Sequence, residues 1–133
     1  MPPKARVLVI DDNPDAVEIM RIALADNDYD VVACLSGDEG LKRVQAEQPD
    51  CIVLDVMMPE MNGFNVCQSL HEMGITTPVV ILSAKSDLKA VARAKELGVF
   101  EYLTKPVSDQ RLAKTVAAAI AAAAREADDD AGT

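Results

Sequence analysis

The sequence predicts an α/β fold: a five-stranded parallel sheet, doubly wound, with helices on both faces in three layers. Five short runs rich in β-branched residues alternate with segments whose apolar residues recur every three or four positions, and these are the spacings of strands and amphipathic helices. Two of the runs, 7–10 and 51–54, are continuously apolar, as strands buried on both faces should be. Regular alternation of strand and helix favours a parallel sheet.

The expected strands are, in chain order, 6–10, 30–35, 51–54, 79–83 and 100–103. The helical segments that follow them are marked in turn by Val17 and Leu24, Leu41 and Val44, Phe64 and Leu70, Leu88 and Leu97, and Leu112 and Ile120. Asn13 followed by Pro14 fits a helix N-cap with proline at the first helical position. Pro78 excludes helix just before the fourth strand, and Gly98 fits the left-handed position that ends a helix.

A length of 133 residues suits one domain with a complete hydrophobic core. We place this domain at 5–124 and expect an acidic, disordered tail at 125–133. The chain has two Phe, two Tyr and no Trp, so its core must be largely aliphatic. The net charge of −9 would repel a phosphate backbone, which argues against direct binding of nucleic acid.

No stretch approaches the roughly 20 apolar residues that cross a membrane, and the first residues do not form a signal peptide. Cys34, Cys51 and Cys67 lack the spacing of metal ligands, and we expect small buried thiols in a reducing compartment. His71, the single histidine, falls on the polar side of its helix, so we expect it to be exposed. These features indicate a cytoplasmic protein that does not insert into membranes.

Polar side chains follow four of the expected strands. Asp11 and Asp12 follow the first strand, Asp55 the third, Ser83 ends the fourth, and Lys105 follows the fifth. In an open α/β sheet, ligands bind outside the carboxyl ends of the strands. We therefore expect these side chains to gather at one edge of the sheet.

Three neighbouring carboxylates repel one another, and a divalent cation removes that repulsion. An oxygen-only site with few protein ligands suits Mg²⁺, which keeps several waters and accepts phosphate oxygens. A carboxylate can also act as the nucleophile in phosphoryl transfer, and a lysine can neutralise the transferred group. The residues thus predict a magnesium-assisted phosphoryl site.

Four motifs carry a family resemblance: VLVIDDNPD at 7–15, IVLDVMMPEMNG at 52–63, VVILSAKSD at 79–87 and YLTKP at 102–106. With them, the chain resembles the response-regulator receiver domains of two-component signalling, the CheY-like superfamily, over residues 5–124. The resemblance implies the flavodoxin-like strand order 2-1-3-4-5. It also implies a stand-alone, single-domain receiver. A fragment of a longer protein would show the same sequence features.

The resemblance implies a role for each site residue. Asp55 corresponds to the phosphoacceptor, Asp12 to the direct Mg²⁺ ligand and Asp11 to its water-bridged partner. The backbone carbonyl of Met57 would complete the metal shell. Lys105 corresponds to the lysine that pairs with the phosphoryl group, and the peptide bond between it and the following proline is expected to be cis.

The resemblance also implies a switch. Ser83 corresponds to the hydroxyl that moves toward the phosphoryl group, and Tyr102 to the aromatic residue that then rotates inward. Ala84 matches the small residue beside the switch hydroxyl. Pro59 and Gly63 match the loop after the acceptor, and Met57 and Lys85 stand where the family tunes the lifetime of the phosphoryl group.

A sensor histidine kinase or a histidine phosphotransfer protein would be the phosphodonor. A downstream effector protein would read the face formed by the fourth helix, the fifth strand and the fifth helix. We expect a monomer or a weak dimer that catalyses only its own phosphorylation and dephosphorylation, and is no enzyme toward other molecules.

Two alternatives stand beside this hypothesis. A phosphorylation-independent interaction domain of the same fold would lack an aspartate or the lysine, and none is missing. An enzyme of related topology would need a Ser/Thr/Gly-rich loop for flavin, or Asp-x-Asp for a phosphatase, after the first strand. Taken alone, Ser83 could be an ordinary strand-end hydroxyl and Tyr102 a half-buried residue at a sheet edge.

Overall fold

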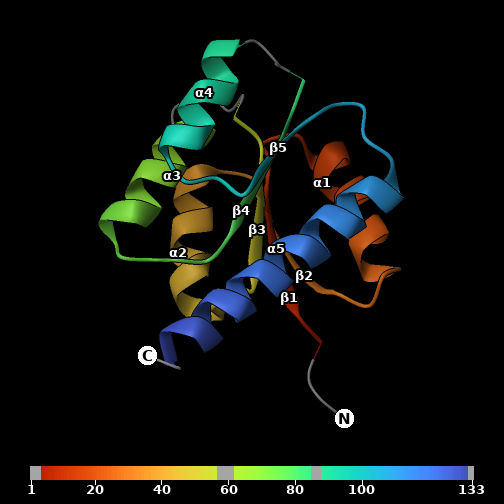
Figure 1. Cartoon of the computed structure of the whole chain (residues 1–133). Helices are drawn as coiled ribbons and strands as arrows, with labels where there is room; N and C mark the ends of the chain where they lie inside the picture. The colour runs from red at the N-terminus through yellow and green to blue at the C-terminus, as the bar shows by residue number, and fades with distance from the viewer. Residues whose placement is uncertain (1–3, 57–61, 85–87, 132–133) are drawn as a thin grey trace.

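Five strands and five helices alternate along the chain in a computed structural model that describes residues 4–56, 62–84 and 88–131, the last five by their backbone alone (Figure 1). In chain order they are β1 (Arg6–Ile10), α1 (Pro14–Ala25), β2 (Asp30–Cys34), α2 (Gly37–Glu47), β3 (Cys51–Leu54), α3 (Gly63–Glu72), β4 (Val79–Ser83), α4 (Leu88–Glu96), β5 (Glu101–Thr104) and α5 (Asp109–Ala131).

All paired strands are parallel, and their order in the sheet is β2-β1-β3-β4-β5. Helices α2, α3 and α4 cover one face, and α1 and α5 cover the other (Figure 1). The predicted three-layer α/β/α fold and its strand order are therefore confirmed. Because every strand runs in the same direction, all five carboxyl ends lie at one edge of the sheet.

Strands β1, β3 and β4 match their predicted bounds, whereas β2 ends one residue early and β5 is shifted by one residue at both ends. β2 stops at Cys34, and the next residue, Leu35, is already exposed. β5 begins one residue late, although the amide of Phe100 still donates to the carbonyl of Val79 at 2.8 Å. Both differences are within the usual uncertainty of element ends.

The core lies on both faces of the sheet, because alternate residues of each strand point to opposite sides. Leu8, Ile10, Ile52, Leu54 and Ile81 pack against α2, α3 and α4. Their neighbours in the sequence pack against α1 and α5, and include Val7, Val9, Val53, Val80 and Leu82. The continuously apolar strands are thus buried on both sides, as their sequences indicated.

Side-chain oxygens cap the amino ends of four helices, α1, α2, α3 and α5. The Asn13 side chain accepts hydrogen bonds from the amides of Asp15 and Ala16 with Pro14 at the first position of α1, as predicted. Ser36 caps α2 through the amide of Glu39. Gly98, with a φ of 77°, takes the left-handed conformation expected after α4.

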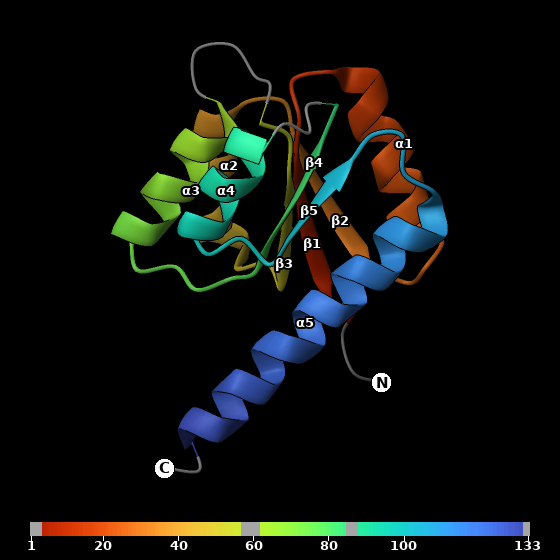
Figure 2. The same ribbon diagram turned by 45° about the horizontal axis from the view of Figure 1, so that its top comes forward.

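Helix α5 is longer than the sequence indicated, because it continues to Ala131 where we expected a disordered tail from 125. Figure 2 shows its last turns extending past the edge of the sheet. Ala119 is the last buried residue of α5 among those whose side chains are described. Beyond it, Ile120 still packs against the core and Ala122 and Ala123 are half-buried, and the high helix propensity of these alanines favours continuation of the helix. Within the described part of the chain, no helix combines the length and apolar character of a membrane span.

We predict that the three cysteines react slowly with thiol reagents in the native protein. Cys34, Cys51 and Cys67 are free and buried, and burial raises the pKa of the first thiol to about 11 and of the other two to about 12. Thiolate is the reactive form, so an aromatic disulfide reagent at pH 8 should label all three only in denaturant. Rapid native labelling of any one would contradict this burial.

Candidate functional site

Charged and polar residues lie together at the carboxyl edge of the sheet. Asp11 follows β1, Asp55 follows β3, Ser83 ends β4 and Lys105 follows β5. These strands are neighbours in the sheet, so residues separated by 94 positions in the sequence come into direct contact. The predicted convergence is present.

Backbone hydrogen bonds extend the sheet by one step into the site. The amide of Asp11 donates to the carbonyl of Cys34 at 3.1 Å, and the amide of Asp55 to that of Ile10 at 3.0 Å. The amide of Lys105 donates to the carbonyl of Ser83 at 2.8 Å. The site residues are consequently held by the sheet rather than by mobile loop backbone.

The Lys105 ammonium joins the two buried carboxylates. Its Nζ lies 3.1 Å from Oδ2 of Asp11 and 3.4 Å from Oδ2 of Asp55. Asp11 is 1% exposed and Asp55 8% exposed, whereas the lysine side chain keeps 30% of its surface in solvent. The other oxygen of Asp11 accepts a hydrogen bond from the amide of Asn13 at 3.0 Å, which fixes the orientation of that carboxylate.

Asp12 completes a cluster of three carboxylates. It is exposed, and one oxygen from each of Asp11, Asp12 and Asp55 lies within 4.8 Å of the others. Lys105 contacts Asp11 and Asp55, and three ionised carboxylates carry more negative charge than this one ammonium neutralises. Such a cluster attracts a cation strongly.

The pKa values of the paired groups reflect this crowding. Burial raises the pKa of the Asp11 carboxyl, and the charge of Asp55 acts in the same direction, while the Asn13 amide and Lys105 oppose the rise without cancelling it. Burial alone would lower the pKa of Lys105, but its contacts with Asp11 and Asp55 raise it. The lysine therefore remains a cation at neutral pH.

The chemistry of the donors fits Mg²⁺. All three side chains offer hard carboxylate oxygens, and at least one of them, Asp12, faces solvent, so a bound ion could keep several waters. The described site contains no sulfur or imidazole ligand that would favour a softer metal. Met57, whose carbonyl is the remaining expected ligand, lies outside the described residues, as do Pro59 and Lys85.

The two expected switch residues, Ser83 and Tyr102, differ in strand and in burial. Ser83 is fully buried at the end of β4, next to the backbone of Lys105. Tyr102 is half-buried on β5 and packs against the core beneath α3 and α4. Ala84 is exposed beside Ser83, and the peptide bond between Lys105 and Pro106 is cis, as expected.

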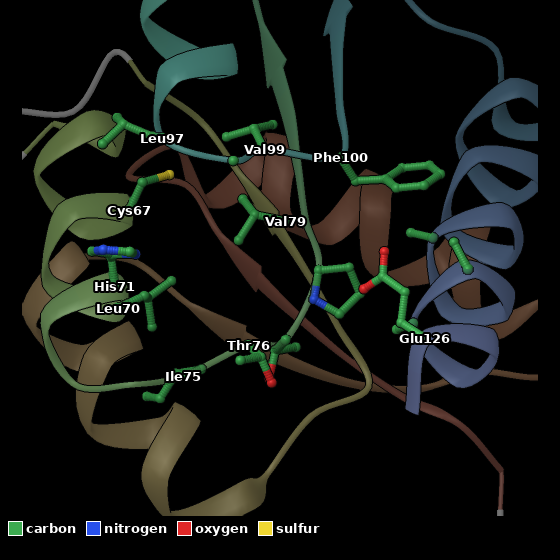
Figure 3. Close-up of a pocket in the computed structure, with 16 residues that line it drawn as sticks. Cys67, Leu70, His71, Ile75, Thr76, Val79, Leu97, Val99, Phe100 and Glu126 are labelled. Atoms are coloured by element: carbon green, nitrogen blue, oxygen red, sulfur yellow. The ribbon is translucent and has the colours of Figure 1, made fainter. Parts of the chain in front are cut away.

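A separate hollow lies at the opposite, amino-terminal edge of β4 and β5 (Figure 3). It has a volume of about 290 Å³ and is lined by side chains that include Leu70, Val79 and Phe100. His71 borders it and is exposed, as the sequence indicated. None of the clustered carboxylates contributes to this hollow, so the candidate site is the acidic edge.

One contributor to the site was not foreseen from the sequence. Asn13 was expected only as a helix cap, yet its amide also holds Asp11. The signal was present, because a residue two positions after an aspartate is within reach of its carboxylate in an Asx-turn. What the sequence could not supply was the direction of the aspartate side chain.

Comparison with known proteins identifies the family. The family model for the response regulator receiver domain matches residues 7–117. The chain belongs to this family. Among solved structures, this receiver domain resembles the chemotaxis protein CheY4 of Vibrio cholerae, with a TM-score of 0.83 and 28% identity over 87% of this chain and 98% of that one. It also resembles a receiver domain protein of Clostridium thermocellum, with a TM-score of 0.82 and 30% identity over 87% and 94%.

Curated relatives include the alkaline phosphatase synthesis transcriptional regulatory protein PhoP of Bacillus subtilis, 36% identical over 80% of this chain and 45% of its own length. The DNA-binding response regulator MtrA of Mycolicibacterium smegmatis is 35% identical over 86% of this chain and 50% of its own length. The chain thus spans about half the length of these relatives. Receivers of this family bind Mg²⁺, interact with histidine kinases and effectors, and are not enzymes in the ordinary sense.

We predict that Mg²⁺ stabilises this receiver domain through Asp12. At ten times its Kd, an ion that binds only the folded state adds about 1.4 kcal/mol to the free energy of unfolding, or about 5 °C in Tm for a domain of this size. Asp12→Asn should lose most of this shift in a thermal melt. Asp15→Asn, an exposed aspartate outside the cluster, is the control, and an equal loss in both variants would contradict the assignment.

Proposed function

We propose that this receiver domain accepts a phosphoryl group on Asp55 and thereby switches its protein contacts. The observation that carries the proposal is that Lys105 contacts both buried carboxylates, at 3.1 and 3.4 Å, beside a third carboxylate. In this proposal Asp55 is the nucleophile, Lys105 the fixed cation and Asp12 a metal-binding group, and their proximity supports these roles. Such an array supplies the alignment and charge neutralisation that phosphoryl transfer needs.

In the proposed reaction, a carboxylate oxygen of Asp55 attacks the phosphorus of a phosphohistidine. The phosphorus–nitrogen bond breaks, its electron pair returns to the imidazole, and that ring takes up a proton. Lys105 already lies beside Asp55 and would pair with the oxygens of the resulting acyl phosphate. Bound Mg²⁺, held by Asp11, Asp12, Asp55 and the carbonyl of Met57, would supply the remaining positive charge. Dephosphorylation by water would follow at the same site.

We further propose that the phosphoryl group draws the hydroxyl of Ser83 toward it, and that Tyr102 then turns inward. Ser83 lies on the strand between Asp55 and β5, and Tyr102 is on β5 itself. The altered surface would be the one formed by α4, β5 and α5. Leu88, the first residue of α4, is 88% exposed.

The partners in this proposal are a sensor histidine kinase or a histidine phosphotransfer protein on one side, and an effector protein on the other. The negative charge of the chain supports a protein rather than nucleic acid as direct partner. Three free buried thiols support a reducing, cytoplasmic setting. Self-catalysed phosphorylation and autodephosphorylation are the only reactions that we assign to the chain.

We predict that Asp55→Asn abolishes labelling by a small phosphodonor in the presence of Mg²⁺, because the amide is not a nucleophile. Intact-mass spectrometry would detect one phosphoryl group on the wild type and none on the variant. Asp28→Asn changes an exposed aspartate in a left-handed turn that asparagine tolerates, and should be labelled normally. Equal labelling of wild type and Asp55→Asn would sink the proposal.

We predict that Lys105→Met lowers the labelling rate by about 10²-fold, the usual effect of removing one preorganised charge partner. Lys114→Met, which changes an exposed lysine of α5, should leave the rate unchanged. Titration with beryllium fluoride and Mg²⁺ provides a second measurement. A wild-type protein that does not respond to it would favour the phosphorylation-independent interaction domain instead.

A further inference from the structure

Gly63, the first residue of α3, lies against the backbone that carries Asp55. Its amide donates a hydrogen bond to the carbonyl of Val56 at 3.2 Å. A Cβ atom at this position would lie 2.6 Å from the carbonyl oxygen of Asp55 and 2.7 Å from Cα of Val56. Both separations are far inside van der Waals contact, and both involve backbone atoms.

The conformation of Gly63 does not itself require glycine. Among the described glycines, only Gly74 and Gly98 have positive φ angles, and Gly63 is part of a helix. Alanine is the better helix former at such a position. Glycine is therefore required at this position because there is no room for a side chain.

Neither side of this contact can move away easily. The start of α3 is held by a capping box in which Asn62 and Asn65 exchange hydrogen bonds of 3.0 and 3.3 Å. On the other side, the amide of Asp55 is bonded to the carbonyl of Ile10 in the sheet. Val66, one turn into α3, is fully buried, so the helix cannot shift without disturbing the core.

We propose that Gly63 is a positioning residue for Asp55: its missing side chain lets α3 seat directly on the acceptor backbone. This seating keeps the Asp55 carboxylate within reach of Lys105 and of the other two carboxylates. The expected effect of a Gly63 substitution on phosphorylation rests on the proposed function. Its expected effect on Mg²⁺ affinity depends only on the placement of the three carboxylates.

Gly40 on α2 offers a matched control. A Cβ there would lie 2.4 Å from Cδ1 of Ile10, so alanine would also be crowded. The obstacles in that case are side-chain atoms of Ile10, with Cγ1 at 2.9 Å as well, rather than backbone atoms of the site. Gly40→Ala thus tests crowding under a helix without a direct push on the Asp55 backbone.

The experiment compares wild type, Gly63→Ala and Gly40→Ala by thermal melts, by calorimetric titration with Mg²⁺, and by the rate of labelling with a small phosphodonor. Both variants should melt below the wild type. Only Gly63→Ala should bind Mg²⁺ about tenfold more weakly and be labelled about tenfold more slowly, as displacement of a reacting group by a fraction of an ångström implies. Wild-type Mg²⁺ affinity in Gly63→Ala, or an equal loss in Gly40→Ala, would overturn the inference.

A double variant identifies which atoms are in conflict. Val56→Ala removes Cγ1, which would lie 3.0 Å from the new Cβ, but leaves the two backbone contacts. Gly63→Ala with Val56→Ala should therefore remain defective, and recovery of Mg²⁺ affinity would contradict a backbone origin. If Gly63→Ala is partly unfolded, all proteins are measured in trimethylamine N-oxide, which favours the folded state. A wild type that binds Mg²⁺ but is never labelled would refute the proposed function and leave the affinity comparison decisive.

Discussion

Repulsion between carboxylates at the ends of β1 and β3 is the constraint on which the arrangement of the site depends. Asp11 and Asp55 are both buried, and neighbouring strands leave them no room to separate. Lys105 relieves part of this repulsion through contacts with both. The remaining negative charge makes a cation a chemically suitable occupant of this edge. The clustered carboxylates that could bind a cation thus also lower the stability of the folded domain.

The rest of the structure holds that unfavourable cluster in place. Aliphatic side chains cover both faces of β1, β3 and β4, so the strands have little freedom to slide relative to one another. The ladder of backbone hydrogen bonds continues to Asp11, Asp55 and Lys105. Asn13 adds a bond that orients one carboxylate. A rigid support of this kind lets the protein hold like charges together without local unfolding.

The sequence predicted the fold and the convergence of the site because both follow from simple periodicity. Apolar runs of strand length, each followed by a helix, determine a parallel sheet, and that sheet brings Asp11, Asp55 and Lys105 to one edge. Close approaches between backbones have no such periodic signal. The lack of room for a side chain between Gly63 and the Asp55 carbonyl and the bond from the Asn13 amide therefore emerged only from coordinates. The extra length of α5 was missed because acidic residues at 128–130 resemble a solvated tail, whereas the alanines before them continue the helix.

The length of α5 means that a small tilt of this helix would displace its far end by a larger distance. It begins shortly after Lys105 and its 23 residues span about 35 Å at 1.5 Å per residue. A tilt of only ~5° at the end near the acidic edge would displace the far end by about 3 Å over that length. A protein bound to the far turns would experience a change comparable to the length of a side chain, although the groups around Asp55 had moved by a fraction of that distance.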